Sequence, residues 1–371
     1  MNVVWVSFRG RWSDNTRALY EGMLRRGTEA EHTWLSGPSA TFPAGVHTVP
    51  FGSPECIEAL EAADLVVSND HIPLDWEKRP GATYLQTWHG TPLKRIHNDV
   101  RWAPEGRLAY LDQDIARWDV LLSPNPASTP LFRRAFGFTG PVVESGYPRN
   151  DVLCVPDRDE RRAAIRAELG IPDGTAAVLY TPTWRDDAVF GTDEPDFSLQ
   201  LDVEDFVTRL GPDHVLLVRA HSMVSDALEP AEGMVDVSGH PDVAELYLAA
   251  DVMVTDYSST MFDFAVTGRP MLFFTYDLED YRDRLRGFYV ELADIAPGPL
   301  LSTSTEVVDA LADLDRVTAE HADAYARFRA TYCSLEDGHA TDRVLDLLDG
   351  LVRQDGELTA LTTGGDDRAH S

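Results

Sequence analysis

Short apolar runs alternate with longer amphipathic segments along most of this chain, and that alternation limits the possible folds more than any other feature. Strands that alternate with helices are typical of a parallel sheet with helices on both faces. A first series of such runs occupies 3–8, 64–69, 84–88, 119–124 and 141–146. A second series occupies 176–184, 214–221, 234–239, 251–259 and 270–277.

The character of the sequence changes between the two series, where a charged amphipathic helix is predicted at 157–171. A chain of 371 residues also exceeds one ordinary core. We therefore predict two Rossmann-like α/β domains whose parallel sheets face a cleft. The predicted domains are 1–154 and 155–350, the second including the terminal helices, and the Gly-, Thr- and charge-rich stretch 351–371 is predicted to be a disordered tail.

Composition excludes some classes of partner. With 32 Lys and Arg against 62 Asp and Glu, the net charge of −30 disfavours general binding to nucleic acid. A small anion can still bind locally at a helix N-terminus or beside a few arginines. The three cysteines, Cys56, Cys154 and Cys333, are too far apart for a zinc cluster or a disulfide framework. The opening run MNVVWVSF is too short for a signal peptide, so a cytoplasmic location is expected.

The strongest motif is VMVTDYSSTMFDFAVTGRP at 252–270, an apolar strand followed by hydroxyl residues and a helix. Ser258, Ser259 and Thr260 can act as helix caps, but at the carboxyl end of a sheet strand they also suit phosphate binding. Asp263 can accept hydrogen bonds from ribose hydroxyls or can simply stabilise the helix N-terminus. Asp256 can bond to the backbone of the turn.

Two further strand ends carry candidate anion-binding residues. In LLVRAH the side chains of Arg219 and His221 point to the same face, and both can donate to a phosphate. In LYTPTWRDD, Thr183 and Arg185 follow a strand, although an ordinary turn explains them equally well. The adjacent aspartates 186 and 187 lack a third ligand, so no metal site is predicted.

The first strand leads into SFRGRWSDNTRALYEG at 7–22, which lacks the spacing of a dinucleotide-binding fingerprint. The acidic net charge argues against a nucleic-acid site at Arg9 and Arg11. Ser13 and Asn15 are helix caps or, alternatively, ligand contacts on the acceptor side.

YLQTWHGTPLKRI at 84–96 places a histidine at a strand end. A neutral histidine can accept a proton from an attacking hydroxyl, and His89 is predicted to lie across the cleft from the phosphate site. Gly90, Thr91 and Lys94 are acceptor-side candidates, and Lys94 either binds an acceptor phosphate or lies on the surface of the following helix.

Taken together and in order, these motifs resemble the CDP-glycerol glycerophosphotransferases of Gram-positive wall and capsule synthesis, which have a GT-B fold. The resemblance covers nearly the whole chain. The segments that carry it are SFRGRWSDNTRALYEG, QTWHGTPLKRI, SPNPASTPLFRRAFGF, ESGYPRNDVL, YTPTWRDD, VRAH, VTDYSSTMFDFAVTGRPMLFF and EDGHATDRVLDLL. Two features depart from the family pattern. A long N-terminal extension seen in some of the polymerases is lacking, and His339 stands where lysine is frequent.

The resemblance implies roles for several residues. His89 is the expected catalytic base, and His221 a second catalytic or phosphate-contacting group. The serine turn is expected to hold the CDP diphosphate, and Asp263 becomes a more favoured ribose contact.

The expected reaction transfers a polyol phosphate, with glycerol phosphate favoured, from CDP-glycerol or CDP-ribitol to a hydroxyl of a lipid-linked glycan or teichoic-acid-type polymer and releases CMP. No cofactor is expected. The alternatives are a GT-B glycosyltransferase that uses a CMP- or UDP-sugar and an inactive nucleotide-binding scaffold in wall assembly. The acceptor implies peripheral association with the cytoplasmic face of the membrane. The segment YRDRLRGFY at 281–289 is either a contact patch for that surface or a charged loop that packs an aromatic residue.

Overall fold

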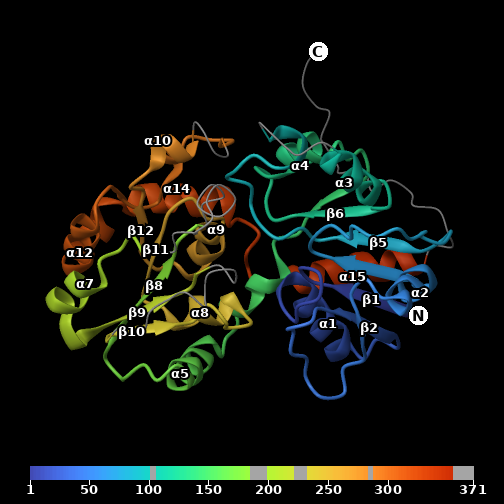
Figure 1. The fold of residues 1–371 in the computed structure, drawn as a ribbon, viewed down its shortest axis with the longest axis horizontal. Coiled ribbons are helices and arrows are strands. Elements are labelled where there is room, and N and C mark those ends of the chain that lie inside the picture. Colours follow the sequence, from blue (N-terminus) through green and yellow to red (C-terminus); the bar gives the residue numbers. More distant parts are fainter. Residues whose placement is uncertain (101–105, 184–198, 221–231, 283–286, 354–371) are drawn as a thin grey trace, which may run out of the picture.

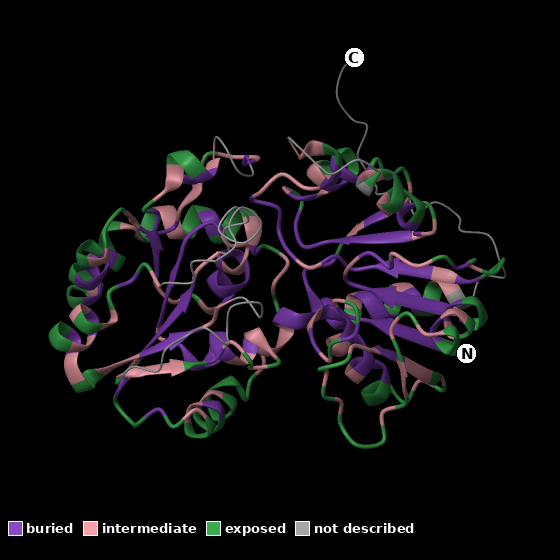
Figure 2. Ribbon diagram, in the orientation of Figure 1, coloured by how far each residue is buried: buried purple, intermediate pink, exposed green. Residues whose placement is uncertain are grey.

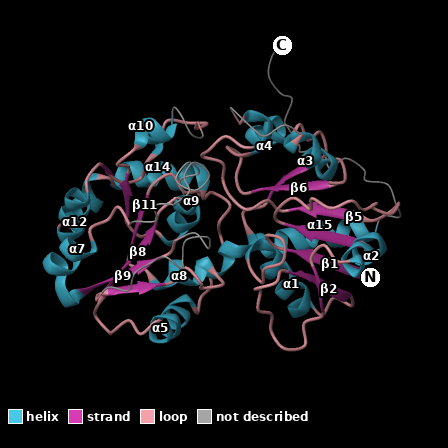
Figure 3. Cartoon of the chain, in the orientation of Figure 1, coloured by secondary structure: helices cyan, strands magenta, loops and turns pink. Residues whose placement is uncertain are grey.

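The chain forms two α/β domains that lie side by side in a computed structural model (Figure 1). The structure describes residues 1–100, 106–183, 199–220, 232–282 and 287–353. Each domain is built on one parallel sheet surrounded by helices (Figure 3). The predicted pair of parallel-sheet domains is confirmed.

The N-terminal domain has seven parallel strands in the order β3-β2-β1-β4-β5-β6-β7. Alternate strand residues point to opposite faces, and both faces are apolar because helices cover both. Val4 belongs to the core under α2 and α4, whereas Val3 belongs to the core under α1 and α15. The bounds are β1 Asn2–Val6, β2 Glu31–Ser36, β3 Thr48–Pro50, β4 Leu65–Ser68, β5 Thr83–Gln86, β6 Val120–Ser123, β7 Val142–Glu144, α1 Asp14–Arg26, α2 Pro54–Ala62, α3 Arg107–Ile115, α4 Thr129–Phe136 and α15 Ala340–Arg353.

The C-terminal domain has six parallel strands in the order β10-β9-β8-β11-β12-β13. Its central strands β8, β11 and β12 are almost wholly buried between two helical layers, whereas the edge strands β10 and β13 are only partly buried (Figure 2). Leu179 belongs to the core beside α5, α8 and α9, and Val178 to the core beside α7 and α12. The bounds are β8 Ala176–Thr181, β9 His214–Val218, β10 Met234–Asp236, β11 Val252–Thr255, β12 Met271–Phe274, β13 Leu300–Leu301, α5 Arg158–Glu168, α7 Val203–Leu210, α8 Val243–Ala249, α9 Thr260–Phe264, α10 Leu278–Asp280, α11 Leu292–Ile295, α12 Ser304–Ala312, α13 Leu314–Glu320 and α14 Ala322–Tyr332.

In both sheets the strand order reverses at one point, and open α/β sheets bind ligands outside the carboxyl ends of the strands at such a point. In the N-terminal sheet the point lies between β1 and β4, and in the C-terminal sheet between β8 and β11. The loops after these four strands are therefore the expected position of a ligand site.

The terminal helix α15 corrects one predicted domain assignment. It was expected in the C-terminal domain, but it returns to the N-terminal domain, where Val344 and Leu345 complete the core beside α1 (Figure 1). Arg26 of α1 fixes it further through Asp342 and Asp346, each at 2.7 Å. The sequence shows that α15 has an apolar face, but only the tertiary structure shows which surface this face packs against. The helix also runs past the expected start of the tail at 351, and residues 354–371 lie outside the described residues.

Two segments therefore connect the domains, and they contact each other. One contains the 3-10 helix Pro148–Leu153, and the other leads from α14 into α15. The carboxylate of Asp151 accepts hydrogen bonds from the backbone N–H groups of Ala340 and Thr341, at 2.9 and 2.7 Å. This contact caps α15 and joins the two connections.

Candidate active site

Two of the predicted motifs meet at the boundary between the domains. His89 and Gly90 follow β5, and Ser258 and Ser259 follow β11. A Cβ atom placed on Gly90 would lie 2.9 Å from Oγ of Ser259, which is closer than side chains approach one another in proteins. A larger residue here would require Ser259 to shift, so the glycine permits the close approach of the loop that carries His89 to the serine turn of the other domain.

A backbone carbonyl holds His89 in one tautomer. Its Nδ1 lies 2.5 Å from the carbonyl oxygen of Asn69. Because a carbonyl oxygen only accepts hydrogen bonds, Nδ1 carries the proton of the neutral ring and Nε2 carries the lone pair. The ring stacks on Trp88 with centroids 4.3 Å apart, and it lies 5.1 Å from the ring of Phe8. Nε2 is therefore the atom of His89 that can take a proton.

Residues with left-handed backbone cluster around His89. Phe8, Arg9 and Asp14, which follow β1, and Trp88 have φ angles between 42° and 68°. Such angles are unfavourable for residues other than glycine and persist where surrounding contacts enforce them. Among the described residues, the remaining non-glycine residue with a positive φ is His97. The strain is thus concentrated at the carboxyl edge of the N-terminal sheet, next to the candidate base.

Two predicted acceptor-side residues lie beneath this strained turn and do not line the site. Asn15 is fully buried, and its Nδ2 donates to the carbonyl oxygen of Trp88 at 3.0 Å. Ser13 is also buried, with its Oγ 3.2 Å from that of Ser7. The predicted ligand contacts of Ser13 and Asn15 are therefore corrected: Asn15 supports the turn before His89, and Ser13 belongs to the buried network below it.

Arg149 is the central residue of the contact between the domains. Its Nη1 donates to Oδ2 of Asp14 at 2.6 Å and to the carbonyl oxygen of His89 at 2.9 Å. Its Nη2 donates to Oδ2 of Asp263 at 2.7 Å. Burial alone would lower the pKa of Arg149, but Asp14 and Asp263 outweigh it and raise the pKa well above its ordinary value. Arg149 thus links the His89 turn to a helix of each domain.

These contacts also give Asp263 a different role from the predicted one. Its second carboxylate oxygen, Oδ1, accepts a hydrogen bond from Nδ2 of Asn150 at 2.9 Å, and the side chain is buried. Burial raises the pKa of Asp263, and the neighbouring Arg149 opposes that rise. With both oxygens bonded inside the protein, the arrangement does not support the predicted ribose contact, and Asp263 instead anchors the helix of the serine turn to Arg149.

The serine turn is organised by Asp256, whose predicted contact with the backbone is confirmed. Its carboxylate accepts from the backbone N–H of Thr183 at 2.9 Å and from that of Tyr257 at 2.6 Å. Ser258 and Ser259 remain half-buried and so stay within reach of a ligand. The helix that follows, α9, covers only Thr260–Phe264, and Oγ1 of Thr260 lies 3.4 Å from that of Thr181. The bond between Thr183 and Asp256 joins the loops after β8 and β11, where the strand order reverses.

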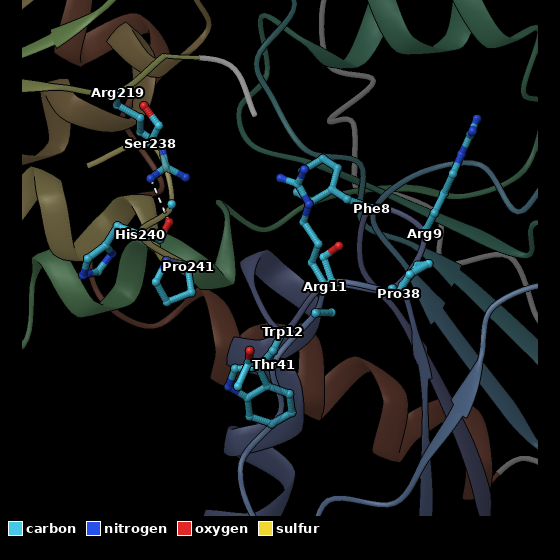
Figure 4. Close-up of a pocket in the computed structure, with 15 residues that line it drawn as sticks. Phe8, Arg9, Arg11, Trp12, Pro38, Thr41, Arg219, Ser238, His240 and Pro241 are labelled. Carbon is cyan, nitrogen blue, oxygen red and sulfur yellow. Dashed lines mark hydrogen bonds between the residues drawn. The ribbon is translucent and has the colours of Figure 1, made fainter. Parts of the chain in front are cut away.

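Arg219 follows β9 and lines a cavity of about 550 Å³ between the domains (Figure 4). Its Nη1 donates to the carbonyl oxygens of Val237 and His240, at 3.2 and 2.8 Å, which fixes the guanidinium at the cavity wall. Loops 8–12 and 37–41 of the N-terminal domain form the opposite wall. Of the other predicted residues near this region, His221 and Arg185 lie outside the described residues.

The remaining acceptor-side candidates differ in accessibility. Thr91 is buried and accepts a hydrogen bond from Nδ2 of Asn125 at 3.4 Å, which corrects its predicted place at the site surface. Lys94 contacts Tyr281 of the other domain, with Nζ 3.4 Å from the hydroxyl and 5.8 Å from the ring centroid. An acceptor contact of Lys94 stays a prediction.

The structural role of Arg149 and Asn150 is not predicted from the sequence. Both belong to ESGYPRNDVL, in which polar residues follow a strand at the predicted domain junction. A cluster of arginine, asparagine and aspartate at a domain junction could have indicated this role, because a buried contact between domains needs paired polar groups.

Two further features concern the described residues alone. No helix among them combines the length and apolar character that crossing a bilayer requires. Within the same ranges, no group of three or more His, Cys, Asp and Glu residues is arranged to hold a metal ion. The expectation of a reaction without a cofactor stays a prediction.

Residues 1–349 match the sequence profile of the CDP-Glycerol:Poly(glycerophosphate) glycerophosphotransferase family. The teichoic acid poly(glycerol phosphate) polymerase of Bacillus subtilis (strain 168) is 37% identical over 93% of this chain, which spans only 48% of that protein. The teichoic acid glycerol-phosphate transferase of Staphylococcus aureus (strain NCTC 8325 / PS 47) is 38% identical over 92% of this chain and 91% of its own length. The chain thus spans about half of one relative and nearly all of another.

Solved structures give the same result. The wall teichoic acid polymerase TagF has a TM-score of 0.86 and 36% identity, over 95% of this chain and 89% of that one. A TagF variant soaked with CDPG has a TM-score of 0.88. The UDP-GlcNAc 2-epimerase of Neisseria meningitidis, at 12% identity and a TM-score of 0.55 over 94% of this chain and all of its own, shares the fold alone. The GT-B architecture expected from the sequence is confirmed.

Proposed function

The chain belongs to the CDP-glycerol:poly(glycerophosphate) glycerophosphotransferase family, and we propose that it transfers a polyol phosphate from a CDP-polyol to a hydroxyl of a lipid-linked or polymeric cell-wall acceptor, releasing CMP. Glycerol phosphate is the preferred unit. The polymerases and the transferase named for glycerol phosphate are 36–39% identical to this chain, whereas those named for ribitol phosphate are 26–30% identical. A glycerol-phosphate primase is 26% identical, so the identity favours the glycerol-phosphate polymerases and transferase and not every enzyme named for glycerol phosphate.

The observation that carries the proposal is the contact between Gly90 and Ser259. It sets the residue that follows His89 in one domain against a half-buried hydroxyl of the other. A transferase needs this juxtaposition, because the attacking hydroxyl must lose its proton next to the phosphorus that it attacks.

We assign the donor to the C-terminal side. Its diphosphate lies against Ser258, Ser259 and the first N–H groups of α9, within reach of Arg219. The acceptor hydroxyl lies beside His89 on the N-terminal side. Thr183 and Arg185 are further candidates for the donor phosphates.

The reaction is then an in-line displacement. Nε2 of His89 takes the proton of the acceptor hydroxyl while that oxygen forms a bond to the distal phosphorus. The bond from this phosphorus to the bridging oxygen breaks, and CMP leaves with that oxygen and its electron pair. The Asn69 carbonyl, which accepts from Nδ1, stabilises the imidazolium that forms, and Arg219 and α9 meet the charge on the departing phosphate. His221 is proposed as a second donor to that phosphate.

The proposal includes a peripheral position at the cytoplasmic face of the membrane, where a lipid-linked acceptor is presented. For the segment 281–289, the described residues favour internal packing over a membrane patch. Tyr281 and Phe288 are buried, and Tyr281 stacks on Tyr257 with centroids 4.4 Å apart. Residues 283–286 lie outside the described residues.

The test combines product analysis with one substitution. Incubation with CDP-glycerol and a glycerol-phosphate-primed lipid acceptor should release CMP and lengthen the acceptor. His89→Ala should lower turnover by about 10²–10⁴-fold, because it removes the general base, and should leave CMP affinity in calorimetry unchanged.

His339→Ala is the matched control, since the side chain of that histidine is 70% exposed and no part in the proposed reaction is assigned to it. Wild-type-like turnover of His89→Ala would remove the base assignment. Release of UDP from a UDP-sugar in place of CMP would favour the glycosyltransferase alternative, and no turnover with any donor would favour the scaffold.

A further inference from the structure

Glu336 has no part in the reaction described above, although it lies where the two connections between the domains meet. It belongs to EDGHATDRVLDLL, one of the motifs that carry the resemblance, and it follows α14 on the second connection. Its Oε1 accepts a hydrogen bond from the backbone N–H of Tyr147, at the start of the first connection, at 3.0 Å. Its other oxygen, Oε2, is buried.

The backbone of Glu336 is held from both sides. Its N–H donates to the carbonyl oxygen of Cys333 at 3.1 Å, and its carbonyl oxygen accepts from Sγ of Cys154 at 3.5 Å. A Cβ on Gly146 would lie 2.7 Å from the carbonyl oxygen of Leu335, so the two connections pack backbone against backbone here. The contact between the connections therefore sets the position of the Glu336 carboxyl.

Through Tyr147 this carboxyl is linked to the loop of the candidate base. Tyr147 is fully buried, and its hydroxyl accepts a hydrogen bond from the backbone N–H of Gly90 at 3.1 Å. Gly90 follows His89 directly. Two hydrogen bonds and one tyrosine side chain thus connect Oε1 of Glu336 with the residue next to His89.

Through Asn150 the carboxyl is linked to the serine turn. Nδ2 of Asn150 donates to Oδ1 of Asp263 at 2.9 Å, and Asp263 belongs to α9, the helix that follows the turn. The same amide lies within hydrogen-bonding reach of Glu336. Asn150 therefore contacts two carboxyl groups, one on the helix of the serine turn and one on the second connection.

An amide between two carboxylates leaves one hydrogen bond unmade, because its nitrogen only donates and its oxygen only accepts. With Nδ2 directed to Asp263, Oδ1 of Asn150 and Oε2 of Glu336 are buried acceptors that have no hydrogen-bond partner among the described residues. Turning the amide over moves the mismatch to Asp263 without removing it. Asp263 is paired with Nη2 of Arg149 at 2.7 Å, which favours its ionised form, so a proton on Glu336 is the arrangement that satisfies both acceptors.

The charges around the Glu336 carboxyl favour this proton. Burial and the carboxylate of Asp263 raise the pKa of Glu336 to about 8. The groups that oppose this rise are the N–H of Tyr147, the amide of Asn150 and the guanidinium of Arg149. The other charged or titratable groups nearby are Asp14, which shares Arg149, and Asp151, Cys154, Cys333 and Asp337. The carboxyl thus keeps its proton at neutral pH, where an ordinary glutamate is ionised.

We propose that Glu336 is a positioning residue: it stays protonated, donates from Oε2 to Oδ1 of Asn150, and so holds the loop of His89 against the serine turn. Its effect on turnover rests on the proposed function. Loss of the proton breaks the bond to Asn150 and adds a negative charge beside Asp263. The alignment is therefore complete below about pH 8 and weakens as the pH rises through that value.

Glu336→Gln tests the inference, because glutamine keeps both hydrogen bonds and does not titrate: its oxygen accepts from Tyr147 and its nitrogen donates to Asn150. Cys154→Ser is the matched control, since that thiol lies beside Glu336 and also loses a proton at alkaline pH. Steady-state kinetics measures kcat from about pH 6 to about pH 9.5. In the protein without substrate, NMR follows the side-chain amide of Asn150 and the backbone amide of Gly90 over the same range. Comparable thermal unfolding midpoints at neutral pH verify that the variants fold.

In the wild type and in Cys154→Ser we expect kcat to fall about tenfold from neutral pH to about pH 9.5. Both amide resonances should shift with a midpoint near pH 8. In Glu336→Gln we expect kcat to change less than about twofold over this range, and neither resonance should show that midpoint.

An Asn150 amide that does not titrate in the wild type, or that titrates equally in Glu336→Gln, would overturn the inference. A shift at Asn150 without one at Gly90, or the same decline of kcat in the wild type and in Glu336→Gln, would remove the positioning role. If the wild type transfers nothing from CDP-glycerol or CDP-ribitol, the proposed function fails, and the NMR titration still decides whether Glu336 holds the loop of His89.

Discussion

Arginines lie between the two domains in two places, and their surroundings differ completely. Arg149 is buried with the carboxylates of Asp14 and Asp263, one from each domain, at 2.6 and 2.7 Å. Arg219 lines the cavity between the domains, and its Nη1 donates to the carbonyl oxygens of Val237 and His240, at 3.2 and 2.8 Å. In the first place the partners of the arginine are carboxylates of both domains, whereas in the second they are backbone carbonyls of the C-terminal domain.

The difference separates an arginine neutralised inside the protein from one whose charge is only oriented. A buried charge is tolerated when the protein itself supplies opposite charges and hydrogen bonds. Backbone carbonyls orient a guanidinium without neutralising its charge, so the proposed donor phosphate can still be attracted to Arg219. The substitutions below test this contrast, beginning with the largest expected effect.

Arg149→Met should destabilise the protein by about 3–5 kcal/mol, because it leaves two buried carboxylates without their cation. Urea unfolding measures the change. Adding Asp14→Asn and Asp263→Asn to the same chain should restore part of the loss, since the unpaired charges are then removed.

Arg134→Ala is the control for that experiment. Its partner is Asp99 at 2.9 Å, but the arginine side chain is 59% exposed, so the unfolding midpoint should hardly move. Equal effects of Arg149→Met and Arg134→Ala would contradict the distinction between the buried cluster and an ordinary surface pair.

Gly90→Ala should lower turnover by about tenfold while leaving stability nearly unchanged. A small displacement of a catalytic group lowers the reaction rate strongly but changes the free energy of unfolding little. The new Cβ would lie 2.9 Å from Oγ and 3.3 Å from Cβ of Ser259. The combination with Ser259→Ala forms a double-mutant cycle, in which the two losses should not add. Additive losses would mean that the two loops do not touch in the working enzyme.

Glu336→Gln should flatten the dependence of stability on pH. Burial raises the pKa of Glu336 to about 8, with Asp263 adding to the rise. The folded state therefore keeps a proton that the unfolded chain loses near its ordinary pKa of about 4.3. The contribution of this carboxyl to the free energy of unfolding is fully present below about pH 4.3, the ordinary pKa. It is lost as the pH rises toward 8, by at most about 1.4 kcal/mol per pH unit.

Urea unfolding at several pH values between 5 and 8 measures this slope. Glu55→Gln, which alters an exposed carboxyl, should keep the slope of the wild type. If Glu336→Gln has the same slope as the wild type, the carboxyl of Glu336 does not stay protonated in the folded protein over this pH range.

Lys94→Met should have the smallest effect, about 0.5–1 kcal/mol from its contact with the ring of Tyr281. Thermal unfolding measures it. The same variant tests the acceptor contact predicted for Lys94, because a rise of more than threefold in acceptor KM would support that contact.

Most of the architecture could be predicted because each buried parallel strand is a nearly continuous apolar run, as in VVWV or VMVT. The exceptions follow from the same rule. β2 has the sequence EHTWLS and is partly exposed, and β3 and β13 contain only three and two residues, so none of them has a long continuous run. The domain to which α15 belongs was predicted wrongly, because an apolar stripe on a helix does not show which surface the helix packs against.

The candidate site could be predicted in part. Strand-end positions identified His89, Arg219 and the serine turn, because the ends of parallel strands meet at one edge. The same reasoning could not separate residues that line the site from those beneath it, so Asn15 and Asp263 were expected to contact ligands. Their partners, Trp88 and Arg149, are 73 and 114 positions away along the chain.

The return of α15 to the first domain has a consequence for synthesis on the ribosome. Val344, Leu345 and Leu348 belong to the same core as Val3 and Leu19. Domains usually fold as units in the order in which they emerge. Here the core of the N-terminal domain stays incomplete until α15 has left the exit tunnel. The C-terminal domain emerges before α15 and can therefore complete its core first.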